Sequence, residues 1–203
     1  MAYTYLQKNF TEDRADKNPL LIPGVPSERR KDRMHTVEAR GAVPISFIPG
    51  LSAGLNGNVV YNMSNSGFND TLSPLPVTGI FTSEYYDYWS FRFGPEFAYM
   101  RRLNLPFFSW RLTGVLTLSA SYSFERRDYK DRKAKDKTGN VKNVTEVDIT
   151  HTINPRVIYQ FNRNWAIFLQ ARRTIARSNF EDERTFRYNY DINSFGLGIQ
   201  YNF

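Results

Sequence analysis

The sequence predicts an all-β fold, and three observations support this prediction. Apolar and polar residues alternate with a period of two along most of the chain, which is typical of strands whose two faces meet different surroundings. Aromatic residues make up 16% of the 203 residues and gather near the ends of the alternating stretches. Long and short connections also alternate between these stretches. Together these features predict an antiparallel up-and-down transmembrane β-barrel with eight strands, a single domain over residues 1–203.

The first half of the chain contains four expected strands, at residues 2–10, 33–47, 51–65 and 85–102. The first stretch, AYTYLQKNF, is short and alternates poorly, whereas TVEARGAVPISF follows the period clearly. In LSAGLNGNVVYNMS the apolar phase consists of Leu51, Ala53, Leu55, Val59, Tyr61 and Met63. In YWSFRFGPEFAYM the apolar phase is aromatic and consists of Trp89, Phe91, Phe93, Phe97 and Tyr99.

The second half contains the other four expected strands, at residues 110–128, 144–162, 165–178 and 184–203. RLTGVLTLSASYSFE and EVDITHTINPRVIYQF each have one apolar phase and one polar phase. The chain ends on SFGLGIQYNF, whose apolar phase is Phe195, Leu197, Ile199, Tyr201 and Phe203. A strand that ends on a bulky exposed aromatic residue needs an apolar cover, because chain ends otherwise fray.

Composition separates the candidate classes. The mean hydropathy is −0.53, and no run of about 18 apolar residues occurs, which excludes a transmembrane helix but not a barrel whose strands alternate. Cysteine is absent, so there is no disulfide framework and no thiolate site. A soluble β-sandwich or a lipocalin-like barrel also alternates. Expected strands of 15 to 20 residues favour the membrane, because globular strands average about 5 to 6 residues.

Connection lengths predict the orientation. Residues 11–32, 66–84 and 129–143 form long connections, and the connections between them are short. Short turns of transmembrane barrels face the periplasm, so both termini are expected there, in a bacterial outer membrane. Two aromatic girdles are expected at the interfaces. The girdle near the short turns would contain Phe47, Phe107, Phe108, Trp110, Phe161, Trp165 and Phe203, and the girdle near the long loops Tyr85, Tyr86, Tyr88, Trp89, Tyr129, Tyr188 and Tyr190.

The last strand carries a family resemblance. Gly198, Tyr201 and Phe203 resemble the glycine, aromatic and terminal aromatic residues by which bacterial outer-membrane β-barrel proteins are recognised by their assembly machinery. The polar residue usual before the glycine is replaced by Gly196. Eight hairpin-linked strands are similar to the small OmpA, OmpX and OmpW barrels, and the final hairpin is also similar to that of larger export-associated barrels. The resemblance implies an assembly signal at these three positions and the assembly machinery as a partner.

Charged residues on the polar phase form an expected lumenal cluster, in which both signs are present: Glu38, Arg40, Arg92, Glu96, Glu146, Asp148, Arg156 and Arg172. An eight-stranded barrel is just wide enough for side chains to fill. Unpaired charges there are costly, so we expect ion pairs that close the tube. The alternative is that these groups solvate a water-filled lumen, as in a barrel enlarged by further strands or another chain.

The net charge of +7 depends strongly on one expected loop, YKDRKAKDKTGNVK. Its bases are Lys130, Arg132, Lys133, Lys135, Lys137 and Lys142. Bases beside an anionic leaflet are expected to contact lipopolysaccharide phosphates, or they simply keep the loop solvated. Nucleic-acid binding is not expected, because aromatic residues are not interleaved with these bases. The apolar loop segments PLLIPGVP and LSPLPVTGIF are candidate contacts for a protein partner.

Catalytic signatures are weak, so no enzymatic activity, cofactor or metal is expected. GLSAG matches G-x-S-x-G at residues 50–54, but a nucleophile elbow needs a helix after the turn and a strand is expected here. His35 and His151 fall on the apolar phase or near a loop. The leading hypothesis is a closed barrel that anchors in the outer membrane and contacts lipid or a partner through its loops. The alternative is a transport or export pore, of which this chain forms all or the C-terminal part.

Overall fold

The computed structural model describes residues 1–14, 29–66, 68–70, 80–82, 84–107, 110–182 and 188–201. The secondary structure in these ranges consists of strands: β1 (Ala2–Arg14), β2 (Arg29–Pro44), β3 (Leu51–Ser64), β4 (Phe68–Asp70), β5 (Ile80–Thr82), β6 (Tyr88–Phe107), β7 (Trp110–Lys135), β8 (Val141–Gln160), β9 (Trp165–Ser178) and β10 (Tyr190–Tyr201). No helix in the described ranges has the length and hydropathy to cross a membrane.

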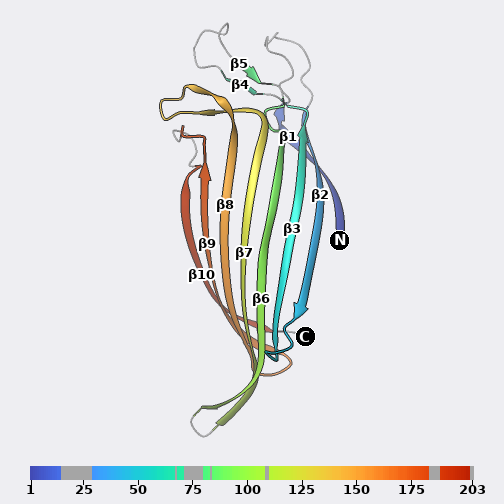
Figure 1. Cartoon of the computed structure of the whole chain (residues 1–203), viewed down its shortest axis with the longest axis vertical. Helices are drawn as coiled ribbons and strands as arrows, with labels where there is room; N and C mark the ends of the chain where they lie inside the picture. Colours follow the sequence, from blue (N-terminus) through green and yellow to red (C-terminus); the bar gives the residue numbers. More distant parts are fainter. Residues whose placement is uncertain are drawn as a thin grey trace.

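Eight strands form one tall, curved sheet (Figure 1). Their order is β1-β2-β3-β6-β7-β8-β9-β10, and every neighbouring pair is antiparallel. Strands β4 and β5 form a separate two-stranded ribbon at one end, which is called the upper end below. The C-terminal end of β10 lies towards the opposite, lower end (Figure 1). The predicted all-β, eight-stranded up-and-down arrangement is confirmed.

The predicted closure of the barrel is not present. In the described residues β1 pairs only with β2, and β10 pairs only with β9. β1 covers only the upper part of β2, because its pairing starts at Ala2 opposite Glu38 and leaves residues 39–44 of β2 without a partner on that side. The alternation of apolar and polar residues reflects the two faces of a strand and not its edges. It therefore does not reveal whether β1 and β10 pair with each other. The sheet is open.

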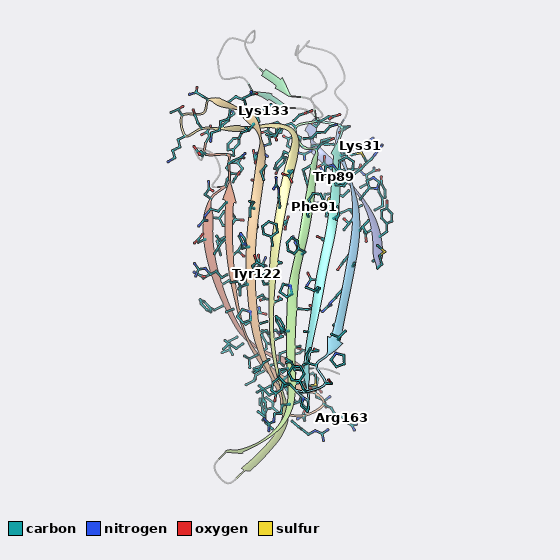
Figure 2. All side chains as sticks on the ribbon, viewed as in Figure 1. Lys31, Trp89, Phe91, Tyr122, Lys133 and Arg163 are labelled. Carbon is teal, nitrogen blue, oxygen red and sulfur yellow. The ribbon has the colours of Figure 1, made fainter. Side chains whose placement is uncertain are left out.

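The two faces of the sheet differ in chemistry. One face carries the apolar phase and is exposed, with Phe195, Leu197 and Ile199 at relative exposures of 81%, 80% and 69%. The opposite face is polar. It is also concave, because residues from five neighbouring strands, β6 to β10, line one hollow on it. Figure 2 shows Trp89 and Phe91 below the upper end and Tyr122 near mid-height. The faces agree with the alternation in the sequence.

Several strand boundaries differ from the expected ones. β7 continues to Lys135 and β8 begins at Val141, so the expected loop at 129–143 is an extended hairpin. Its turn is stabilised by the Asp136 carboxylate, which accepts hydrogen bonds from Thr138 and Asn140, and by Gly139, whose φ of 90° favours glycine. The ribbon of β4 and β5 lies within the expected loop at 66–84. β10 begins at Tyr190, later than the expected residue 184.

Gly198 is required by a neighbouring ring. A Cβ atom at this position would lie 2.5 Å from Cζ of Phe168, the residue opposite it on β9, whereas a Cβ at Gly41 would have no atom within 4 Å. We predict that Gly198→Ala lowers the free energy of unfolding by about 1–3 kcal/mol through this overlap. Gly41→Ala is the control and should be neutral or stabilising. Urea unfolding in detergent micelles measures both, and equal effects would contradict the packing argument.

Candidate functional site: the polar face

Three hollows lie on the polar face of the sheet. The upper hollow has a volume of about 460 Å³ and the second about 450 Å³, and Arg172 lines both of them. A smaller hollow of about 220 Å³ lies at the side of β2 and β3 and is lined by Glu38, Arg40 and Glu96 among others. The polar face is therefore not filled by its own side chains.

One predicted lumenal pair forms directly. Arg40 on β2 donates two hydrogen bonds to the Glu96 carboxylate on β6, at 2.8 Å from Nε and 2.9 Å from a terminal nitrogen. This fork geometry is the strongest arrangement for an arginine and a carboxylate. It spans β3, which lies between the two strands. Glu38 lies beside this pair in the same hollow.

Arg92 is paired with a residue that the sequence analysis did not select. Its guanidinium contacts Glu125, which lies directly opposite on β7. Arg127 also contacts this carboxylate at 3.2 Å, and the Ser90 hydroxyl donates to it at 3.1 Å. Glu125 belongs to the polar phase of its strand, but its partner depends on strand register, which alternation does not reveal.

Arg132 and Glu146 form a buried pair at the upper end. Arg132 Nε lies 2.7 Å from a carboxylate oxygen of Glu146, which is fully buried at 0% exposure. The guanidinium also donates a hydrogen bond of 2.9 Å to the Tyr188 hydroxyl. Four rings surround it at 4.8–5.6 Å: Tyr85, Tyr129, Phe180 and Tyr188. We call Arg132, Glu146 and these rings the upper plug.

The upper plug lies beyond the part of β8 that pairs with β9, which ends at Asp148 opposite Ser178. Burial raises the pKa of Glu146 to about 7, although the nearby Arg132 charge lowers it. Burial likewise raises the pKa of Tyr85 above its ordinary range. A carboxyl group with a pKa near neutrality next to a fixed arginine makes the plug sensitive to pH.

Within the described residues, the remaining predicted lumenal residues are not joined into ion pairs. One carboxylate oxygen of Asp148 is buried without a hydrogen-bond partner, and the same holds for Nε of Arg156. The Arg156 guanidinium lies over the Phe168 ring at 5.1 Å. For Arg172 the described part of the chain provides neither an ion pair nor a hydrogen bond, although the residue lines two hollows.

The bases of the predicted basic loop lie in different surroundings in the structure. Arg132 is inside the upper plug, Lys130 contacts Glu84, and Lys142 contacts Glu181 at 3.0 Å. Lys133 and Lys137 are exposed near the upper end, and Lys135 belongs to the same hairpin. Figure 2 shows Lys31 and Lys133 at the upper end and Arg163 at the lower end. Lys133 and Lys137 therefore remain available for an external ligand.

The expected upper aromatic girdle is largely wrong. Tyr85, Tyr129 and Tyr188 contact Arg132 in the plug, and Tyr88 lies under Arg127 on the polar face. Trp89 does belong to the apolar face, where it stacks on Tyr61 with ring centroids 4.3 Å apart. A tyrosine near a strand end can satisfy its hydroxyl inside or outside a sheet, so position along the strand does not determine its face.

The residues of the expected assembly signal are partly described. Tyr201 packs against Trp165 with ring centroids 4.7 Å apart, and Gly198 faces Phe168. Phe203 lies outside the described residues, as does PLLIPGVP and most of LSPLPVTGIF.

The G-x-S-x-G segment does not form a nucleophile elbow. Ser52 lies on strand β3, and its hydroxyl donates to the Ala98 carbonyl oxygen at 3.3 Å. His151 contacts the hydroxyl of Tyr122 at 2.7 Å, and His35 contacts the hydroxyl of Tyr3 at 2.8 Å. Ser52 lies opposite Pro44 and Ala98 in the sheet, not opposite either histidine. In the described ranges, no group of three His, Cys, Asp or Glu side chains has the spacing of a metal site.

No known protein family, characterised protein or solved structure matches the chain. Functional inference therefore depends on the sheet itself.

Proposed function

We propose that this chain forms the wall of a bacterial outer-membrane β-barrel that serves as a transport or export pore. The apolar face would lie in lipid, and the polar face would line a water-filled lumen. The observation that carries this proposal is the combination of a largely apolar exposed face with unfilled, charged hollows on the opposite face. In a membrane barrel, lipid-facing and lumen-facing residues alternate in this way.

The open sheet favours a pore over a closed anchor. Eight strands closed on themselves leave room only for side chains, whereas the hollows here measure about 450 Å³ or more on β7 to β10. Unpaired backbone groups along β1 and β10 cannot remain in hydrocarbon. Further strands that pair with these edges would close the barrel and widen its lumen.

The second candidate is the closed anchor with no catalytic activity. The ion pairs Arg40–Glu96 and Arg92–Glu125 favour it, together with the upper plug, because such contacts can block a narrow tube. In this case β10 would pair with β1 in the membrane. The loops would then be the part of the protein that contacts a partner.

Both candidates place the upper end at the outer surface and the lower end of β10 on the periplasmic side. Exposed bases such as Lys133 and Lys137 would then contact phosphates of lipopolysaccharide. The Gly198–Tyr201 end of β10 would be read by the barrel assembly machinery. Binding to lipopolysaccharide should fall in a Lys133→Gln, Lys137→Gln variant if these contacts form.

The test of the pore is conductance together with native mass. We predict a steady ion conductance in single-channel recordings of the purified protein in planar bilayers. The reason is that water fills the polar hollows. Mass measurement in detergent shows whether the conducting species contains one copy or several. A monomer of 23.7 kDa without steady conductance would contradict the pore and support the anchor.

A further inference from the structure

The second hollow of the polar face has an unusual lining. It measures about 450 Å³, and its polar lining comes from β7 to β10: Ser121, Thr152, Asn154, Gln170, Arg172 and Ser194. Arg172 is the one charged residue among the described residues that line it. A hollow of this volume lies in the range that small ligands occupy.

Arg172 differs from three other arginines of the polar face, Arg40, Arg92 and Arg127. Arg40 and Arg92 are each held by a carboxylate, and Arg127 shares the carboxylate of Arg92. Arg172 lies opposite Ser194 on β10 and has no acidic partner in the part of the chain that the structure describes. It borders the upper hollow as well as the second one, so its guanidinium is available to a ligand entering from above.

A second cation lies near Arg172. Arg156 is opposite Gln170, two residues before Arg172 on β9, and diagonal neighbours of this kind are about 7–8 Å apart. The nearest acids in the upper hollow are Glu125 and Asp148, and Glu125 is already engaged by Arg92. The described lining of the upper hollow, which Arg172 shares, contains four arginines and these two acids, so its net charge is positive and attracts anions.

The remaining lining supplies neutral hydrogen-bond donors. The hydroxyls of Ser121, Thr152 and Ser194 and the side-chain amides of Asn154 and Gln170 can each donate to an oxyanion. The guanidinium offers a planar fork that matches a carboxylate or a phosphate with two hydrogen bonds. The described residues that line the second hollow include no carboxylate that could bind a cation.

We propose that Arg172 and the surrounding hydroxyl and amide groups bind a small oxyanion, a solute carrying a phosphate or a carboxylate group. In the pore this site would make the lumen anion-selective, and that part of the inference rests on the proposed function. Binding of the anion itself depends only on the polar face.

The experiment uses the full chain and two independent measurements. The first is calorimetric titration of the detergent-solubilised protein with inorganic phosphate and, separately, with acetate. The second is the reversal potential in planar bilayers under a KCl gradient. The test variants are Arg172→Gln and Arg172→Lys. Arg173→Gln is the matched control, because Arg173 is the next residue, lies on the apolar face and contacts Asp191 at 3.8 Å.

We expect the unmodified protein to bind phosphate or acetate and to pass chloride in preference to potassium. Arg172→Gln should lower the affinity about tenfold or more, because a charge-assisted hydrogen bond is lost, and should reduce the anion preference. Arg172→Lys should keep the preference but bind less tightly, which separates this result from misfolding. Arg173→Gln should leave both unchanged.

The outcomes distinguish the inference from the proposed function. Anion binding without conductance contradicts the pore but supports the Arg172 site. Conductance without anion preference, or binding that Arg172→Gln and Arg173→Gln weaken equally, overturns the site while the pore stands. Preference for phosphate over acetate, or the reverse, identifies which oxyanion the site accepts.

Discussion

Leu197→Arg is expected to weaken insertion of the protein into lipid bilayers by about 2–4 kcal/mol, the cost of an arginine on the lipid face near the bilayer midplane. Leu197 is 80% exposed on the apolar face of β10, and it lies midway between the ion-paired Asp191 and the lower ring of Tyr201. In water, an exposed leucine could be replaced by arginine at little cost. The size of the effect therefore reports whether this face meets lipid.

The measurement is equilibrium folding into lipid vesicles as a function of urea, followed by tryptophan fluorescence. Ser194→Arg is the control, because Ser194 lies on the same strand but faces the polar side. It should change the free energy of insertion much less than Leu197→Arg does. Similar effects of the two variants would show that the faces are not divided between lipid and water.

Removal of Arg132 is the second change with a large expected effect. Above pH 7, where Glu146 is ionised, Arg132→Leu would leave this fully buried carboxylate without its counter-charge, and breaking a buried pair typically costs about 3–5 kcal/mol. The double variant Arg132→Leu, Glu146→Leu removes both charges and should recover much of this loss. Urea unfolding in micelles provides the comparison, and an equally unstable double variant would contradict the buried-pair interpretation.

The same pair makes a prediction for pH. The pKa of Glu146 is raised to about 7 from an ordinary value of 4.5, so the folded protein binds more protons than the unfolded protein between these values. The contribution of Glu146 to stability is thus fully present below pH 4.5 and is lost as the pH rises to about 7. Glu146→Gln should remove this slope. A slope that persists in the variant would assign it to another group.

The strands and their two faces could be predicted from the sequence because a period of two survives wherever one face is apolar. It survives along β8, where Val147, Ile149 and Ile153 oppose Asp148 and Thr152. It disappears in YKDRKAKDKTGNVK, where both faces are polar, so the sequence predicts a loop where β7 in fact continues to Lys135. The same loss of pattern placed Arg132 among loop bases and concealed its position in the plug.

Pair identities could not be predicted, because they depend on register between strands. Arg92 meets Glu125 through direct pairing of β6 with β7. Arg132 reaches Glu146 only after an irregularity in the β7–β8 ladder between Asp128 and Lys133. An even strand number and the cost of an unpaired edge in lipid both predict closure, but in the described residues β1 and β10 each have one open edge.

Site-directed spin labelling along β10 tests the central claim most directly, that the apolar face lies in lipid and the polar face in water. Labels at residues 193–199 of the reconstituted protein are probed with oxygen, which concentrates in lipid, and with a water-soluble nickel chelate. We predict that labels replacing Phe195, Leu197 and Ile199 respond to oxygen and that labels replacing Ser194 and Gly196 respond to the chelate. Equal access of the chelate to both sets would contradict the account.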